Sequence, residues 1–202
     1  MYVYEPLIPM ALGAYLLGSI PFGVVLAKLF GLADPRTIGS GNIGATNMLR
    51  TGNKKVALLT LLLDAGKGVG AVFIARYIDG YATYVTLAIL MAALGHMYSP
   101  WLRFNGGKGV ATLLGGVLAF SWPVGLVFCA VWLLIFLLTR YVSLASVLAL
   151  AALPLATHFL VDPEAALPMA LAALIAIYKH RGNIARLRTG TEPKMMSKKG
   201  EA

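Results

Sequence analysis

The sequence contains few of the residues that usually build disulfides or metal sites. It has one cysteine, Cys129, and three histidines among 202 residues. A single cysteine excludes an intrachain disulfide, and three scattered histidines do not give the ligand spacing of a metal site. We therefore expect a protein that works without a metal ion or another cofactor.

Two common enzyme motifs are also absent. The G-x-S-x-G turn of serine hydrolases does not occur. The segment 104–112, FNGGKGVAT, contains a Gly-Lys pair, but a Walker loop also needs a glycine five residues before that pair and a serine or threonine after it. Leu102 and Gly109 stand at these two positions. The sequence therefore does not predict nucleotide hydrolysis.

Acidic residues are scarce, whereas apolar residues dominate. The chain has 8 Asp and Glu against 17 Lys and Arg, a formal net charge of +9, and 59% hydrophobic residues. About 20 apolar residues in a row span the hydrocarbon core of a bilayer, and runs that approach this length recur along the chain. The pattern predicts an all-α integral membrane protein. The first run follows MYVYEP rather than a basic segment, so we expect it to remain as a span and not to be removed as a signal peptide.

Seven transmembrane helices are predicted from apolar runs at 7–30, 56–78, 82–98, 110–120, 124–138, 142–161 and 165–178. The segment 110–138 could form one long helix or two short ones that turn at 121–123. Two helices place nearly all lysines and arginines on one side of the membrane, whereas one helix would separate Arg140 from the basic residues after 178. Under the positive-inside rule, seven spans put the N-terminus outside and the C-terminus in the cytoplasm.

The positive charge is thereby explained as a cytoplasmic collar next to anionic lipid headgroups. Nucleic-acid binding is not expected, because the bases flank helices and no separate soluble domain carries a recognition element. We expect a single transmembrane catalytic domain over residues 1–188. Residues 189–202 form a polar, basic segment that we expect to be a disordered tail.

Two glycine-rich segments lie on the predicted cytoplasmic side. The first, 39–50 (GSGNIGATNMLR), alternates glycines with hydroxyl and amide side chains and ends at Arg50. Glycines let an anion approach backbone amides, and arginine offers a planar fork to phosphate. The second, 104–112, places Lys108 among glycines before a predicted helix N-terminus, which favours phosphate. The alternative is an ordinary turn that carries the basic residues of the positive-inside pattern.

A third polar segment, 180–188 (HRGNIARLR), follows the last predicted span. His180 and Asn183 share one face if the helix continues, and a basic helix lying on the membrane interface leaves these two residues unexplained. Arg186 is a weaker candidate. Ser143 and Ser146, at the start of the sixth span, could donate hydrogen bonds to the same site, although serines in spans often bond their own backbone.

Ionisable residues also occur inside the apolar runs. Asp64 and Lys67 are three residues apart in the second span, so they can pair on one helix face. Such a pair can be functional or purely structural, and both interpretations stay open. We expect His96, which precedes Pro100, to help shape the second polar segment. His158 is expected to be structural.

Together, GSGNIGATNMLR, GHMYSPWLRFNGGKGVAT and HRGNIARL resemble the three cytoplasmic motifs of the bacterial membrane acyl-phosphate:glycerol-3-phosphate acyltransferase family. The resemblance covers essentially the whole chain. It implies transfer of a fatty acyl group from acyl phosphate to the 1-position of sn-glycerol 3-phosphate, giving lysophosphatidic acid and phosphate in phospholipid biosynthesis. It also implies a multi-pass protein of the bacterial inner membrane with its active site facing the cytoplasm.

The resemblance assigns roles to specific residues. The catalytic candidates are His180, Asn183, Ser40 and Lys108. The candidates for binding substrate phosphate are Ser40, Gly41, Asn42, Thr46, Asn47, Arg50, Gly106, Gly107, Lys108, Gly109, Ser143 and Ser146. The expected partners are acyl phosphate, glycerol 3-phosphate, membrane lipids and an enzyme that supplies acyl phosphate.

The chemistry leaves one assignment open. Acyl phosphate has an activated carbonyl, so we expect direct attack without an acyl-enzyme. The proton of the attacking hydroxyl could pass to His180 or to a phosphate oxygen of the donor. A transporter of organic anions is the rival function, because such proteins also place helix N-termini around an anion. Against it, all three motifs face the cytoplasm rather than the bilayer midplane, and no inverted repeat is evident. A purely structural membrane protein would leave the phosphate-binding pattern unused.

Overall fold

The structure of this protein is a computed structural model that describes residues 7–195. Every regular element over this range is helical, which confirms the predicted all-α class. The helices are α1 (Leu7–Ser19), α2 (Phe22–Leu29), α3 (Ala45–Met48), α4 (Lys54–Ile78), α5 (Ala82–Met97), α6 (Val110–Phe120), α7 (Trp122–Thr139), α8 (Val142–Leu160), α9 (Ala166–Lys179) and α10 (Arg181–Arg188). Two short 3₁₀ turns, Leu49–Thr51 and Pro100–Leu102, complete the fold.

Five stretches are long and apolar enough to cross a membrane: α1 with α2, α4, α5 with its 3₁₀ extension, α7 and α8. Helices α6 and α9 are apolar but shorter, with 11 and 14 residues. The segment 110–138 divides as the charge argument favoured, because α6 ends at Phe120 and α7 begins at Trp122. Ser121 between them has an extended backbone, with φ −148° and ψ 103°.

The first apolar run differs from the single helix expected over 7–30. It breaks at Ile20 and Pro21, between α1 and α2. Proline has no amide hydrogen and its ring clashes with the preceding helical turn, so the helix stops there. At the break, the carbonyl of Ile20 accepts hydrogen bonds from the amide of Phe22 at 3.1 Å and from Lys67 Nζ at 2.9 Å. A local kink thus provides a partner for a charge buried on another helix.

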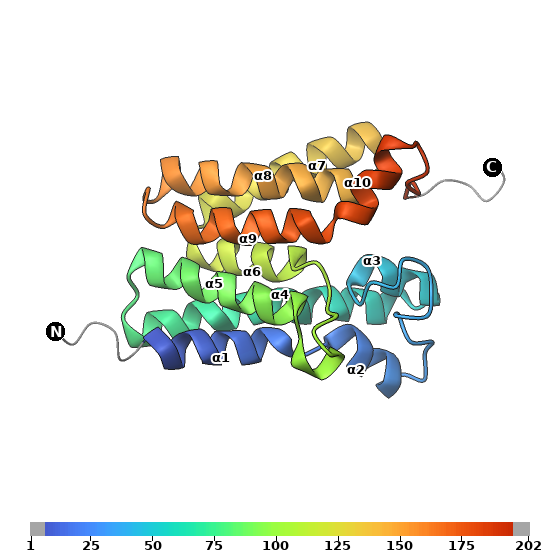
Figure 1. Ribbon diagram of the computed structural model, residues 1–202, viewed down its shortest axis with the longest axis horizontal. Helices are drawn as coiled ribbons and strands as arrows, with labels where there is room; N and C mark the ends of the chain where they lie inside the picture. Colours follow the sequence, from blue (N-terminus) through green and yellow to red (C-terminus); the bar gives the residue numbers. More distant parts are fainter. Residues whose placement is uncertain (1–6, 196–202) are drawn as a thin grey trace.

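Helix α6 lies in the middle of the bundle, between α4 and α5 on one side and α7 on the other (Figure 1). Its contact with α4 depends on glycine. A side chain at Gly115 would meet the backbone of Ala65, and one at Gly68 would meet the backbone of Thr112. Small residues let two helix backbones come this close, which favours helix pairing in a bilayer.

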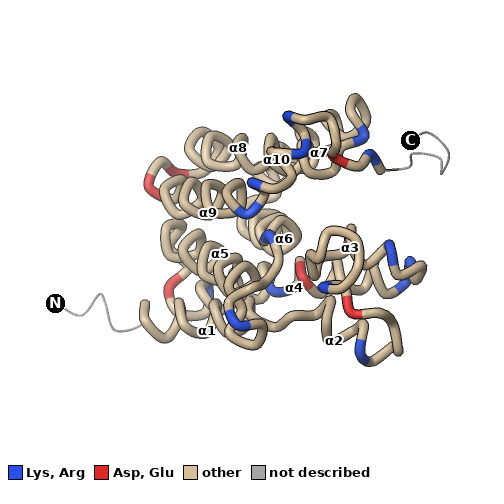
Figure 2. The backbone as a smooth tube through the Cα atoms, turned by 45° about the vertical axis from the view of Figure 1, so that its right-hand side comes forward, with Lys and Arg blue, Asp and Glu red and all other residues tan. Residues whose placement is uncertain are grey.

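The three polar segments lie at the same end of the bundle. The segment containing α3, the loop that leads into α6 and helix α10 all face the right-hand side of Figure 1. Figure 2 shows lysines and arginines gathered mainly at this end, whereas acidic residues of the α4–α5 and α8–α9 connections lie at the other end. Segments far apart in the sequence therefore meet around one region.

The described part of the C-terminal segment does not extend away from the bundle, which differs from the disordered tail expected over 189–202. Residues 189–195 turn back over the end of α8, where the amide of Met195 donates to the carbonyl of Arg140 at 3.0 Å. Glu192 is buried there. The expectation for 196–202 falls outside the described residues.

Candidate active site

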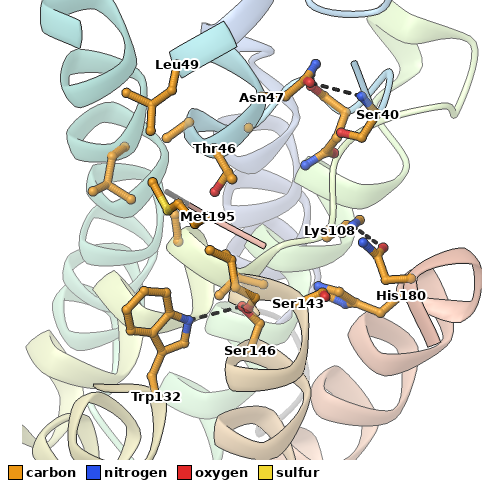
Figure 3. Close-up of a pocket in the computed structure, with 18 of the residues that line it drawn as sticks. Ser40, Thr46, Asn47, Leu49, Lys108, Trp132, Ser143, Ser146, His180 and Met195 are labelled. Carbon is orange, nitrogen blue, oxygen red and sulfur yellow. Dashed lines mark hydrogen bonds between the residues drawn. The ribbon is translucent and has the colours of Figure 1, made fainter. Parts of the chain in front are cut away.

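One cavity of about 640 Å³ opens where the polar segments meet the helices. Its polar part combines residues of all three segments with one face of α8 (Figure 3). Most of the predicted site residues line it: Ser40, Asn42, Thr46, Asn47, Arg50, Lys108, Gly109, Ser143, Ser146, His180 and Asn183. Gly41, Gly106 and Gly107, which we predicted to bind substrate, are not among the lining residues.

Most of the remaining cavity wall is apolar, although Asp64 of α4 and His96 of α5 also line it. The apolar part consists of side chains from α4, α6 and α7, namely Leu61, Leu114, Phe128, Cys129, Trp132 and Leu133. Cys129, which the sequence places only within an apolar run, therefore shares a cavity with the polar segments. A cavity with one polar and one apolar part suits an amphipathic ligand that has an anionic head and a hydrocarbon tail.

The first segment is held in shape by Asn47. This buried side chain donates from Nδ2 to the carbonyls of Pro35 at 2.6 Å and Asn42 at 2.8 Å, and its Oδ1 accepts from the amide of Ser40 at 3.1 Å. Because these contacts occupy the amide, Asn47 shapes the loop instead of offering free donors. The side chains of Ser40 and Thr46 stay exposed at the cavity.

Arg50 packs against the same loop at Gly39. Gly39 has a φ of 54°, in the left-handed region, and any side chain there would overlap the Arg50 side chain. Arg50 Nη1 lies 3.5 Å from Asn47 Oδ1, a long contact that leaves most of the guanidinium available. The loop thus presents an arginine fork to the cavity.

The second segment brings a helix N-terminus to the cavity. Gly109 caps α6 with a φ of 79°, which glycine adopts without strain, and the following residues Val110 and Ala111 line the cavity. The amides of Gly106 and Gly107 donate to the carbonyls of Met97 and His96, at 3.2 and 3.0 Å. These two glycines therefore fasten the loop to the end of α5, as expected of a loop shaped by His96.

His180 has one ring nitrogen engaged and one free for a ligand. Its Nδ1 lies 2.8 Å from the carbonyl oxygen of Ala176, which can only accept, so Nδ1 carries the hydrogen and Nε2 carries the lone pair. Burial, with a further contribution from the charge of Lys108, lowers the pKa of His180 to about 4. The imidazole is therefore neutral near pH 7 and can accept a hydrogen bond.

A hydrogen-bonded chain connects the second and third segments. Lys108 Nζ donates to Asn183 Oδ1, and Asn183 Nδ2 donates to Glu192 Oε1 at 2.6 Å. Ser143 Oγ donates to the same carboxylate oxygen at 2.6 Å, while Arg186 Nε donates to Oε2 at 2.7 Å. Asn183 is thus fixed between a cation and an anion, and its amide oxygen holds Lys108 in place.

Glu192 is a site residue that the sequence did not reveal, and Arg186 was only a weak candidate. Burial raises the pKa of Glu192, but hydrogen bonds from Ser143, Asn183 and Arg186 outweigh this effect, so the pKa lies below its usual range. Burial also lowers the pKa of Lys108 to about 8, although the charge of Glu192 opposes the shift. The available sequence signal was that Glu192 is one of only two acidic residues, with Glu201, in the basic segment 189–202.

Ser146 lines the cavity, but its hydroxyl is already engaged. It donates to the carbonyl of Val142 at 2.8 Å and accepts from Trp132 Nε1 at 3.1 Å. This is the backbone bonding that serines in apolar helices often make. Ser146 therefore orients Trp132 on the cavity wall, whereas Ser143 joins the chain around Glu192.

Comparison with known proteins gives consistent matches over most of the chain. The family profile described as glycerol-3-phosphate acyltransferase matches residues 8–190. A glycerol-3-phosphate acyltransferase from Roseobacter denitrificans is 57% identical over 186 residues, covering 92% of both chains. One from a Jannaschia species is 54% identical over 185 residues, covering 92% of this chain and 91% of the relative.

Two solved structures are also similar. They are crystal structures of PlsY (YgiH), an integral membrane glycerol 3-phosphate acyltransferase, in a glycerol 3-phosphate form and a lysophosphatidic acid form. The first aligns with a TM-score of 0.88 at 44% identity, and the second with 0.86 at 43% identity. Each alignment covers 94% of this chain and 95% of the other.

Proposed function

We propose that this chain, which belongs to the glycerol-3-phosphate acyltransferase family, transfers a fatty acyl group from acyl phosphate to the 1-position of sn-glycerol 3-phosphate. The products are lysophosphatidic acid and phosphate. The observation that carries this proposal is the single cavity that joins cationic and backbone-amide groups to an apolar wall. An acyl phosphate needs both parts, and glycerol 3-phosphate needs the polar one.

The first task of the site is to hold two anions together. Two unit charges 4 Å apart repel by about 4 kcal/mol at an effective dielectric constant of 20. Arg50, Lys108 and the amides at the start of α6 can offset this repulsion, because all three reach the same cavity. Bringing the hydroxyl and the acyl carbonyl into contact then lowers the barrier by orientation.

In the proposed step, the 1-hydroxyl oxygen attacks the acyl carbonyl. A bond forms between this oxygen and the carbonyl carbon, and the bond from that carbon to the phosphate oxygen breaks, with its electron pair leaving on phosphate. His180 Nε2 accepts a hydrogen bond from the hydroxyl and orients it, and the proton ends on the departing phosphate. Direct transfer of the proton to His180 is the alternative.

The acyl chain would lie along the apolar wall between α4 and α7. These helices flank α6 on the cavity side and present Leu61 and Leu133 to the cavity. Lipid-soluble substrate can enter sideways from a bilayer by this route, whereas glycerol 3-phosphate enters from the aqueous end.

We further propose seven spans in the bacterial inner membrane, with the N-terminus outside and the site facing the cytoplasm. The gathering of basic residues at the site end supports this orientation under the positive-inside rule. Helices α6 and α9 would cross as short helices within the bundle. Residues 1–188 form one catalytic domain in this proposal, and a separate enzyme supplies acyl phosphate.

The test is an assay of purified protein in detergent with acyl phosphate and glycerol 3-phosphate. We expect lysophosphatidic acid with acyl phosphate and none with acyl-CoA in its place. Arg50→Ala should lower kcat/KM about a hundredfold, whereas Lys28→Ala, an exposed lysine outside the cavity, should not. Absence of product would reject the proposal, and uptake of glycerol 3-phosphate into proteoliposomes without acylation would favour the transporter.

A further inference from the structure

A buried charged cluster lies behind the second polar segment. Lys67 Nζ is 2.8 Å from Asp64 Oδ1 on the same helix, 2.9 Å from His96 Nδ1 on α5 and 2.9 Å from the carbonyl of Ile20 at the α1–α2 break. Lys67 is 1% exposed, Asp64 2% and His96 4%. Burying charges away from water costs free energy, and ionisable residues at such depth usually mark a functional site.

The geometry fixes which nitrogen of His96 carries the hydrogen. Lys67 is paired with the Asp64 carboxylate and is therefore an ammonium, which has three donors and no acceptor. A hydrogen on His96 Nδ1 would point at these donors, whereas a lone pair accepts from them. The contact to Asp64 Oδ1 is longer, at 3.5 Å. Nδ1 is therefore the acceptor, and a neutral His96 carries its hydrogen on Nε2.

The Nε2 atom lies against the second polar segment, on a side chain that lines the cavity. His96 is one of the cavity-lining residues, and a side chain added at Gly107 would overlap Nε2. Within residues 7–195 the polar contacts of the His96 side chain are made by Nδ1, and no protein group accepts a hydrogen bond from Nε2. His96 Nε2 is thus a buried donor without a protein partner among the described residues, and it lies beside Gly107, the residue that precedes Lys108.

We propose that His96 is a further substrate-binding residue, whose Nε2–H donates a hydrogen bond to a phosphoryl oxygen held by the 104–112 loop. The inference rests on the proposed function for the identity of the anion. The Asp64–Lys67 pair acts as a positioning unit, because it holds the imidazole in one tautomer and one orientation. A neutral donor at this place binds phosphate without adding another cation beside Lys108. Gly107 is small because the imidazole occupies the space of its side chain.

The experiment compares two substitutions, one that keeps a polar atom near the position of Nδ1 and one that keeps a polar atom near the position of Nε2. In His96→Asn the short amide can still accept from Lys67 but does not reach the position of Nε2, whereas the longer amide of His96→Gln can place a donor there. We expect His96→Asn to raise KM for a phosphate-bearing substrate roughly ten- to hundredfold, as for loss of a hydrogen bond to a charged group, with a smaller change in kcat. His96→Gln should recover most of this loss. His158→Asn, at an exposed position on α8 outside the cavity, is the matched control.

Separate KM values for acyl phosphate and for glycerol 3-phosphate, together with inhibition by inorganic phosphate, identify whose phosphoryl group is bound. The proposal would be overturned if His96→Asn left both the KM values and the inhibition by inorganic phosphate unchanged. It would also be overturned if His96→Asn and His96→Gln raised KM equally and both lowered thermal stability. In the unaltered protein, NMR of ¹⁵N-labelled histidine should show hydrogen on Nε2 of His96 and a shift when inorganic phosphate is added. Hydrogen on Nδ1 would also overturn it. If the proposed function itself were wrong, the unaltered protein would form no lysophosphatidic acid, so the two failures can be told apart.

Discussion

At the scale of single residues, burial sets the charge states that the site offers to its substrates. The pKa of Lys108 is lowered to about 8 and that of His180 to about 4, both mainly by burial. Between these values Lys108 is charged and His180 is neutral. This combination provides a cation for phosphate and an acceptor for a hydroxyl at the same pH.

The alkaline side of the pH profile should therefore report Lys108. A lysine with a lowered pKa loses its charge as pH rises through that value, so kcat/KM should fall above about pH 8. Substrate phosphate, with a second pKa near 6, is already fully ionised there. In Lys108→Arg, kcat/KM should be lower but flat up to pH 9, because arginine stays charged. An unchanged alkaline limb in this variant would assign the titration to another group.

His180 can be tested by separating orientation from proton transfer. If His180 Nε2 orients the attacking hydroxyl, His180→Gln should keep appreciable kcat, because its amide can still accept a hydrogen bond, and His180→Ala should lose far more. Equal inactivity of the two variants would make His180 an obligatory base. Mass spectrometry during a single turnover should detect no acylated serine or cysteine, and an acylated side chain would contradict direct attack.

At the scale of elements, loops and terminal segments complete a site that the long helices only frame. Asn47 ties the first segment together, the carbonyls at the end of α5 hold the second, and Glu192 fastens the segment after α10 to α8 and α10. These contacts join side chains as far apart in sequence as Ser143 and Glu192. Loss of one of these sets of hydrogen bonds should change the shape of the cavity without unfolding the helix bundle.

Truncation of the C-terminal segment tests whether the contacts of Glu192 are needed for activity. A chain ending at Met195 keeps Glu192 and all its described contacts, so we expect nearly normal kcat/KM and thermal stability. A chain ending at Thr191 loses the carboxylate that orients Asn183 and Arg186, and we expect at least a tenfold lower kcat/KM. Glu192→Ala in the full chain should reproduce this loss. Normal activity in Glu192→Ala would show that the hydrogen bonds of Glu192 are not needed for activity.

At the scale of the whole molecule, seven spans require the two termini to lie on opposite faces. Cysteines introduced as Tyr2→Cys and Ser197→Cys, each in a Cys129→Ala background, should react with an impermeant reagent from opposite sides, with only the second cytoplasmic. Because Cys129 lines the apolar part of the cavity, the background variant must first be shown to retain activity, which a small apolar replacement should allow. Labelling of both positions from one side would return the number of spans to an even value.

Much of this architecture could be predicted from the sequence, because hydrophobicity and charge follow the chain locally. Apolar runs predicted the helices, the distribution of charge favoured the break at 121–123, and the three polar segments were expected at one end. The pairing of Asp64 with Lys67 also follows from helical spacing alone. The break at Pro21 was missed because the apolar composition continues across it.

Side-chain direction and contacts between distant segments depended on the tertiary structure. Spacing could not show that Gly106 and Gly107 pack on α5 instead of lining the cavity, or that Cys129 faces it. Nor could composition show that a polar segment expected to be disordered places Glu192 against Ser143 and Asn183. The sequence by itself determined the membrane class, most of the helices and the residue types that we propose bind phosphate. Helix packing decided which of these side chains converge, because such contacts arise only when the backbones of distant helices come together.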